Sequence, residues 1–221
     1  DLVRSRGLGD VYKRQEVYSK SKGENDYNDD INARSLMTNY LSGGSAYNPT
    51  EQGLKVPFEL TFAMHSDAGF KTDDALVGSL GIYTTDFNDG KVNSGVSRYT
   101  SRDLTDMVLT GLQKDISSRF GIQWARRSMW NRNYSETRLP AVPSMILETL
   151  SHQNFADLKL GYEPDFKFTV ARSVYKSILK YLAEMHHSSY TVQPLPVSHF
   201  AISEGKKKNT FELRWTPTED P

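Results

Sequence analysis

Two segments of the sequence end an apolar run in a side chain that can bind a metal or move a proton. The first is the run 58–64, which alternates in polarity and leads directly to His65. The second is the apolar run 143–147, which ends at Glu148. Imidazole is a common metal ligand, and a partly desolvated carboxylate is a common general base. If both runs are strands of one sheet, His65 and Glu148 can share a site at the strand ends.

Polar residues near these positions are candidates to bind substrate or to orient the site. Asp67 lies two residues after the histidine and is a candidate to orient its ring. His152 and Asn154 follow the glutamate closely, and Arg127 carries a guanidinium that can bind a carboxylate or an oxyanion. Arg127 can equally form a surface ion pair, and His152 can simply cap the segment that follows it.

The two central residues also have ordinary structural interpretations. A histidine at a strand end is often only a hydrogen-bonded structural residue. A glutamate there can interact with the N-terminus of a following helix. A shared site therefore requires that both segments be strands and that the two strands lie close together.

The composition excludes several classes of function. The 221 residues carry 27 Lys and Arg against 27 Asp and Glu, and they include no cysteine. A chain without excess positive charge offers no electrostatic footprint for nucleic acid. Without thiols there are no disulfides, cysteine nucleophiles or thiolate zinc sites, so any metal must be held by nitrogen and oxygen. No apolar run approaches the roughly 20 residues that a transmembrane helix requires.

Strand patterns alternate with helix patterns along the chain. Apolar residues at helical spacing predict helices over 30–41, 101–119 and 164–182, the second with Ser101 as its N-cap. Strands are predicted over 16–19, 56–64, 77–84 and up to residue 147. This alternation predicts an α/β fold, a three-layer, mostly parallel sheet with helices on both faces.

The two ends of the chain differ from this pattern. Residues 10–15 (Asp-Val-Tyr-Lys-Arg-Gln) look like the translation of a sequencing-library adapter, so residues 1–15 are interpreted as an artefact of cloning or assembly. Residues 188–221 contain two runs of period two around a polar turn, which predict an antiparallel pair of strands and hence an incomplete β-sandwich. Residues 16–187 form the predicted α/β domain.

Three short motifs resemble those of a known family. Asp26, Ile31 and Arg34 reproduce its spacing of an acidic residue, an aliphatic residue and an arginine. Residues 64–68 (Met-His-Ser-Asp-Ala) resemble its Ser-Ile-His-Ala-Asn-Ala motif, and residues 147–151 (Leu-Glu-Thr-Leu-Ser) resemble its Val-Glu-Thr-Gly-Phe-Leu-Ser motif. The family is that of the zinc-dependent N-acetylmuramoyl-L-alanine amidases, which cut bacterial cell walls.

The resemblance spans most of residues 16–183 and implies a six-stranded α/β sheet. It also implies a Zn²⁺ ion held by two histidines and a glutamate, with a further glutamate as the catalytic base. His65 matches the second zinc histidine, Glu148 matches the catalytic glutamate, and Arg127 falls near an arginine of the family. The first zinc histidine and the zinc glutamate have no counterpart here. The resemblance therefore implies that they precede residue 16, and that the domain lacks its N-terminal strands.

The pattern is most similar to a branch common in Bacteroidetes, in which a fibronectin type III module often follows. Residues 190–221 resemble the opening strands of such a module, with Trp215 at the position of its buried tryptophan. Peptidoglycan or muropeptides are the implied partners. The implied location is the bacterial cell envelope, either periplasmic or secreted.

The resemblance thus predicts zinc-dependent hydrolysis of the amide bond between N-acetylmuramic acid and L-alanine in peptidoglycan. Because this chain would supply one zinc ligand of three, the fragment itself is expected to be inactive. Two alternatives stay open. A zinc carboxypeptidase-like peptidase would need a His-x-x-Glu motif ahead of residue 16. A non-catalytic glycan-binding protein could keep the same fold.

Overall fold

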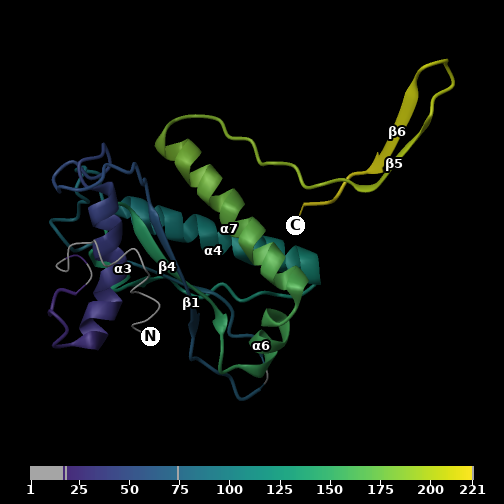
Figure 1. Ribbon diagram of the computed structural model, residues 1–221. Helices are drawn as coiled ribbons and strands as arrows, with labels where there is room; N and C mark the ends of the chain where they lie inside the picture. The colour runs from purple at the N-terminus through teal and green to yellow at the C-terminus, as the bar shows by residue number, and fades with distance from the viewer. Residues whose placement is uncertain (1–16, 18, 74, 221) are drawn as a thin grey trace.

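The structure is a computed structural model that describes residue 17 and residues 19–73 and 75–220 (Figure 1). The interpretation of residues 1–15 falls outside the described residues, as does most of the strand predicted over 16–19. The elements in chain order are α3 (Asp26–Ser42), β1 (Thr61–Asp67), β2 (Leu80–Tyr83), α4 (Tyr99–Phe120), β3 (Trp130–Asn131), α5 (Ser135–Arg138), β4 (Ser144–Ser151), α6 (Phe155–Gly161), α7 (Pro164–Met185), β5 (Ser198–Glu204) and β6 (Phe211–Thr216).

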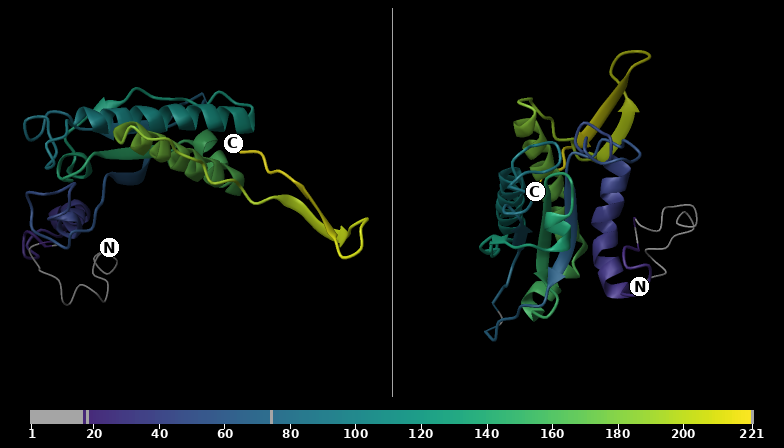
Figure 2. Two further views of the ribbon diagram at one scale, coloured as in Figure 1. Left: turned by 90° about the horizontal axis from the view of Figure 1, so that it is seen from above. Right: turned by 90° about the vertical axis from the view of Figure 1, so that its left-hand side faces the viewer.

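The central sheet has the strand order β1-β4-β2-β3. β1 pairs with β4 in parallel, β2 pairs with β3 in parallel, and β2 runs antiparallel to β4. Figure 2 shows α4 and α7 on one side of this sheet and α3 on the other. The predicted α/β class with a mostly parallel, helix-covered sheet is confirmed, with one antiparallel pairing that makes the sheet mixed.

The main core lies between the sheet and the helix pair α4 and α7. Phe166 of α7 contacts the fully buried Trp124 with ring centroids 5.2 Å apart, and Trp124 Nε1 donates a hydrogen bond of 3.0 Å to Ser79 Oγ. Four side chains of α4 recur every four residues, which puts them on one face of the helix, and all four are fully buried: Leu104, Val108, Leu112 and Ile116. Burial of this stripe holds α4 on the sheet.

α3 docks on the opposite side through polar contacts instead of an apolar stripe. Asn39 is buried, and its side chain donates to the carbonyl of Leu139 at 2.9 Å and accepts from the N–H of Ala141 at 2.8 Å. Ser135 Oγ donates to Asn32 Oδ1 at 2.8 Å. The apolar residues that predicted this helix are instead mostly half-buried. Hydrogen bonds to α5 and to the segment after it therefore fix the position of α3.

The predicted N-cap of the second helix was wrong. Ser101 lies inside α4, which begins at Tyr99 after Arg98. The Ser101 side chain is fully buried, and its Oγ accepts a hydrogen bond of 3.0 Å from the N–H of Ser144 in β4. The hydroxyl thus joins the helix to the sheet, so it does not cap the helix end. The short helices α5 and α6 were not predicted.

The C-terminal segment forms a separate two-stranded antiparallel sheet of β5 and β6. Its base is tied to α7, because the Arg172 guanidinium pairs with Asp220 and also donates to the carbonyl of Gln193. Trp215, which the resemblance assigns to a buried position, is 54% exposed. The antiparallel pairing is confirmed, whereas the larger sandwich stays a prediction.

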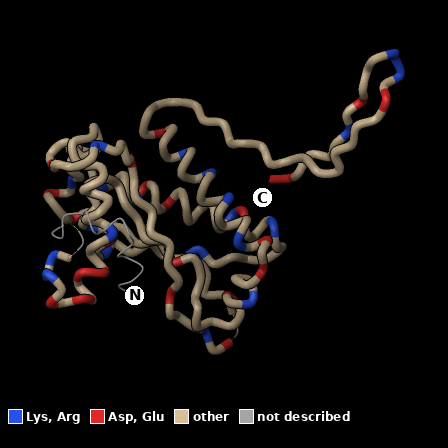
Figure 3. Tube along the Cα trace, viewed as in Figure 1, with Lys and Arg blue, Asp and Glu red and all other residues tan. Residues whose placement is uncertain are grey.

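Charges of both signs are spread along the chain (Figure 3). The three lysines 206–208 lie at the tip of the β5–β6 hairpin. Among the described residues, no helix has the length and apolar character needed to cross a bilayer.

The core predicts a large difference between two phenylalanines of α7. Phe166 is 1% exposed and Phe168 is 46% exposed. We expect Phe166→Ala to lower the free energy of unfolding by about 3–5 kcal/mol, because it leaves a cavity against Trp124. Phe168→Ala, the matched control, should cost less than about 1 kcal/mol. Urea denaturation measures both, and equal losses would contradict the assigned core.

Asp29 predicts a specific acid sensitivity. Its carboxylate accepts hydrogen bonds from the N–H and Oγ of Ser21 and from Ser19 Oγ, at 2.7–2.8 Å. The backbone hydrogen bond from Ser21 is the largest cause that lowers the pKa of Asp29 from 3.8 to about 2. A depressed pKa stabilises the fold above pH 3.8, and this contribution is lost as the pH falls toward 2.

We therefore expect Asp29→Asn to destabilise the protein at neutral pH, and the gap from the parent protein to shrink between about pH 4 and pH 2. Asp26→Asn, in the same first turn of α3 but exposed, controls for loss of a charge there. The measurement is the midpoint of urea denaturation for the parent protein and both variants across this pH range. A gap that stays constant down to pH 2 would refute the role of Asp29.

Candidate functional site

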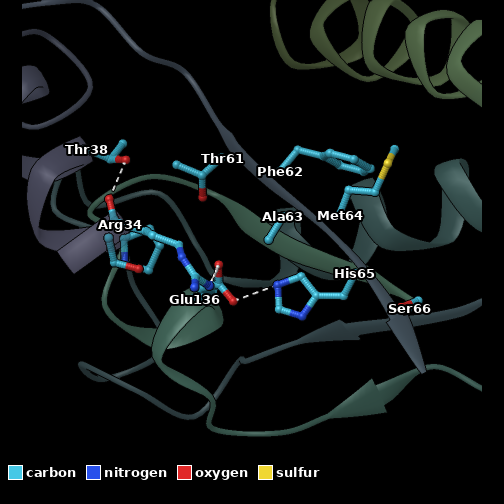
Figure 4. A pocket seen from close by; sticks show the side chains of 11 residues that line it. Arg34, Thr38, Thr61, Phe62, Ala63, Met64, His65, Ser66 and Glu136 are labelled. Carbon is cyan, nitrogen blue, oxygen red and sulfur yellow. Dashed lines mark hydrogen bonds and ion pairs between the residues drawn. The ribbon is translucent and has the colours of Figure 1, made fainter. Parts of the chain in front are cut away.

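A groove of about 650 Å³ opens beside the outer edge of β1, and we call it the His65 groove. α3, β1 and α5 supply its walls (Figure 4). Its polar lining includes Arg34, Thr38, Thr61, His65, Ser66 and Glu136. The groove therefore combines one imidazole, one carboxylate and one guanidinium.

Strand pairing places the two predicted chemical residues next to each other. In the parallel register of β1 and β4, His65 lies directly opposite Glu148. Because side chains alternate between faces of a sheet, opposite residues point to the same side. On that side Leu80, Ile82 and Ile146 form a small buried cluster. His65 and Glu148 thus lie next to a small apolar cluster on the same face of the sheet.

One carboxylate lies on the side of each nitrogen of the His65 ring. Nε2 lies 2.9 Å from Glu136 Oε2, and Nδ1 lies 4.0 Å from Glu148 Oε1 (Figure 4 shows the Glu136 contact). The hydrogen bond that the His65 ring donates to Glu136 raises the pKa of His65 above its ordinary value, against an opposing effect of burial. The ring is 35% exposed, so it remains accessible from the groove.

Glu136 is held from two sides. Its side chain is 15% exposed, and Arg34 Nη1 donates to its Oε1 at 3.2 Å, while Arg34 Nη2 pairs with Asp30. Burial acts to raise the pKa of Glu136, but the hydrogen bonds and charges of His65 and Arg34 outweigh it and lower the pKa. Glu136 is therefore a carboxylate that stays ionised beside His65.

Glu148 has the opposite electrostatic character. Burial raises the pKa of this carboxyl above its ordinary value, and its side chain is 14% exposed. Its Oε2 is buried and has no hydrogen-bond partner among the described residues. A partly desolvated carboxylate with a raised pKa is suited to accept a proton.

Asp67 and Arg127 form a pair of their own. A bulge after His65 shifts the register of the strand pair by one residue. Asp67 therefore pairs with Ser151 and not with Leu150. The Asp67 carboxylate contacts the Arg127 guanidinium, which also lies 5.8 Å from the centre of the Trp130 ring. Burial acts to raise the pKa of Asp67, but the hydrogen bond from Arg127 lowers it. In the described structure Asp67 is thus directed to Arg127 and not to the His65 ring.

The remaining predicted residues lie at the C-terminal end of β4. His152 is exposed, and its Nδ1 lies 3.1 Å from Ser66 Oγ. Asn154 is 2% exposed. Its side-chain oxygen accepts a hydrogen bond from the N–H of Lys71, and its side-chain nitrogen donates one to the carbonyl of Ala75. The Asn154 amide is therefore engaged inside the protein, where it holds the segment after β1.

Asp157 was not predicted, yet it organises this end of the sheet. Its fully buried carboxylate accepts the N–H groups of Val77, Gly78 and Ser151 at 2.9–3.0 Å. These donors come from the entry to β2 and from the last residue of β4. One carboxylate thus joins two segments that flank the site.

Sequence reasoning also missed Glu136 as a site residue. The only local signal was an acidic residue in the short segment 135–138, just ahead of the apolar run that ends at Glu148. Arg34 was identified as part of a family motif, without a partner. In the structure Arg34 lines the His65 groove and forms an ion pair with Glu136.

The described residues supply only part of a zinc site. Within the described part of the chain, no group of three or more His, Asp or Glu side chains is arranged to hold a metal. His65 nevertheless offers a ring nitrogen beside Glu148, whose buried Oε2 lacks a partner there. These residues fit one part of a nitrogen and oxygen site for zinc.

Comparison with solved structures shows which known fold this is. The N-acetylmuramoyl-L-alanine amidase from Clostridium difficile 630 is 14% identical with a TM-score of 0.50, over 69% of this chain and 64% of that chain. The CwlD amidase from Clostridioides difficile, in complex with the GerS lipoprotein, is 16% identical with a TM-score of 0.50, over 79% of this chain and 71% of that one. The chain has the fold of these amidases.

Identities this low show a shared fold and nothing about activity. The chain spans 64% of the length of the first of these amidases. No family model and no curated protein matches the sequence.

The role of Asp157 is testable. We expect Asp157→Ala to lower the free energy of unfolding by about 3 kcal/mol or more, because it leaves three buried N–H donors without an acceptor. Asp165→Ala is the matched control, since its carboxylate forms an exposed ion pair with Arg119 at 2.8 Å, and it should cost about 1 kcal/mol or less. Urea denaturation compares them, and a small loss for Asp157→Ala would rule out its organising role.

Proposed function

We propose that the protein hydrolyses the amide bond between N-acetylmuramic acid and L-alanine in peptidoglycan, with Zn²⁺ as its cofactor. The observation that carries the proposal is the pairing of His65 with Glu148 across β1 and β4, on a fold shared with amidases. His65 would be a zinc ligand and Glu148 the general base. The substrate would be peptidoglycan or muropeptides, in the bacterial cell envelope.

The residues have properties that this reaction needs. An amide is inert to water at neutral pH, so its hydrolysis needs an activated water, a polarised carbonyl and a proton for the leaving amine. A bound zinc ion supplies a more acidic water and a Lewis acid. Glu148 would take the proton from the attacking water and deliver it to the amine nitrogen, a role favoured by its raised pKa.

The other groups of the site would bind and orient the substrate. Arg127 would exchange its contact with Asp67 for a carboxylate of the peptide stem, because a guanidinium binds carboxylates through parallel hydrogen bonds. His152 is exposed at the end of β4 and would contact the substrate there. The cationic and acidic side chains around the His65 groove make it suitable for a polar ligand.

The proposal extends to parts of the protein beyond these residues. We propose that the other zinc ligands, a histidine and a glutamate, come from residues that precede the described part of the chain. We also propose that residues 188–221 begin a fibronectin type III-like module. The outer edge of β1 pairs with no strand among the described residues, so it is available for pairing with further strands.

The test is amidase activity and zinc content of the protein expressed with its natural flanking sequence. We expect about one zinc per chain and release of stem peptides from purified peptidoglycan. Glu148→Ala should keep the zinc and lower the release at least about 100-fold, because it removes the proton carrier. Glu184→Ala, an exposed residue of α7, is the matched control.

Three results would overturn the proposal. A protein that binds no zinc and releases nothing favours the non-catalytic glycan-binding alternative. Full activity in Glu148→Ala would remove Glu148 from the reaction. Cleavage of peptides in place of the muramoyl amide would instead favour a carboxypeptidase-like enzyme.

A further inference from the structure

We propose that Glu136 is a positioning residue for His65, which fixes the ring with its proton on Nε2 and leaves Nδ1 free to bind a ligand beside Glu148. Glu136 lies far from His65 in the sequence, on the short helix α5. Its carboxylate nevertheless makes the shorter of the two carboxylate contacts to the ring. The metal-binding consequence of this proposal rests on the proposed function, whereas the position of the proton does not.

The first step is the difference between the two ring contacts. A neutral imidazole carries one N–H donor and one nitrogen lone pair, and the hydrogen bonds around it select between the two tautomers. Nε2 lies 2.9 Å from Glu136 Oε2, which is hydrogen-bond distance. Nδ1 lies 4.0 Å from Glu148 Oε1, which is too far for a hydrogen bond. The neutral ring is therefore an Nε2–H donor to Glu136.

The second step is that Glu136 is itself held in place. Arg34 Nη1 donates to its other oxygen, Oε1, at 3.2 Å. The neighbouring Ser135 hydroxyl donates to Asn32 Oδ1 of α3, and Ser35 Oγ donates to the Ser135 carbonyl. Both side-chain oxygens of Glu136 thus have fixed and different partners, so Oε2 is directed at the ring.

The third step concerns the free nitrogen. With the proton on Nε2, the lone pair of Nδ1 points toward the side of the ring where Glu148 lies. Glu148 Oε2 is buried and unpartnered within the described structure. A cation or a polar ligand group on this side of the ring would bind Nδ1 and lie beside the Glu148 carboxylate. Metal-binding histidines commonly donate their second N–H to a carboxylate, which fixes the tautomer in this way.

The simpler interpretation is an ion pair that only stabilises the contact between β1 and α5. The chain offers a comparison, because His186 Nε2 lies 2.5 Å from Glu59 Oε2, away from the His65 groove. If Glu136 acts only as an anion, substituting it would affect stability but would leave the tautomer of His65 unchanged. If it positions the ring, its substitution moves the proton.

The test is long-range ¹H–¹⁵N NMR of the histidine rings in the ¹⁵N-labelled 221-residue chain, at a pH high enough for every ring to be neutral. His65→Gln assigns its signals among the five histidines. We expect the Nε2–H tautomer of His65 to dominate in the parent chain. A dominant Nδ1–H form, or an equal mixture, would overturn the proposal without any need for a variant.

Glu136→Gln should reverse the tautomer. Arg34 would still donate to the side-chain oxygen of the glutamine, so the amide NH₂ would face Nε2 of His65. The NH₂ group donates, so Nε2 must carry a lone pair and the ring proton moves to Nδ1. Glu59→Gln is the matched control and should leave His65 unchanged. An amide spectrum with the dispersion of the parent shows that each variant is folded. An unchanged His65 tautomer in folded Glu136→Gln would overturn the proposal.

Zinc affinity gives a second readout for the protein with its natural flanking sequence. We expect Glu136→Gln to weaken zinc binding about 10- to 100-fold, with Glu59→Gln unchanged. Equal zinc affinity in the parent and Glu136→Gln would contradict the positioning role. A parent protein that binds no zinc would defeat the proposed function, and the tautomer measurement would then decide this proposal alone.

Discussion

The parallel pairing of β1 with β4 is the constraint on which the rest of the site depends. It sets His65 directly opposite Glu148, on the face of the sheet that carries the small cluster of Leu80, Ile82 and Ile146. A shift of one residue would turn His65 to the other face, because side chains alternate along a strand. The register is thus fixed by the same burial that forms the sheet, and the chemistry depends on that register.

The pairing alone does not make a site, because both side chains must also be oriented. Two carboxylates from outside the strands act on this part of the sheet. Glu136, on α5, contacts the His65 ring, and Asp157, on α6, joins the end of β4 to the entry of β2. The two carboxylates nearest the His65 ring, Glu136 and Glu148, then differ in their electrostatics. The pKa of Glu136 is lowered, whereas burial raises the pKa of Glu148, so one carboxylate remains an anion and the other is suited to accept a proton.

The parts that sequence predicted are those set by local pattern. The strands that carry His65 and Glu148 followed from apolar runs, although β1 continues to Asp67 and β4 to Ser151 instead of ending at these residues as predicted. α7 followed from its apolar stripe. The parts that it missed depend on contacts between distant segments. Glu136 has no informative neighbours in the sequence, and only folding brings it to His65. Ser101 resembled a helix cap because the sequence around it does not show that its hydroxyl accepts a hydrogen bond from the N–H of Ser144. The polar docking of α3 through Asn39 was likewise invisible to a search for apolar periodicity.

The most direct test of the central claim is anomalous diffraction at the zinc absorption edge, from crystals of the protein with its natural flanking sequence grown with zinc. The claim is that β1 and β4 bring His65 and Glu148 into one metal-dependent site. It predicts a single strong peak about 2.1 Å from Nδ1 of His65, on the Glu148 side of the ring, with Glu136 still bonded to Nε2. A zinc peak remote from His65, or a peak on Nε2 with Glu136 displaced, would contradict it.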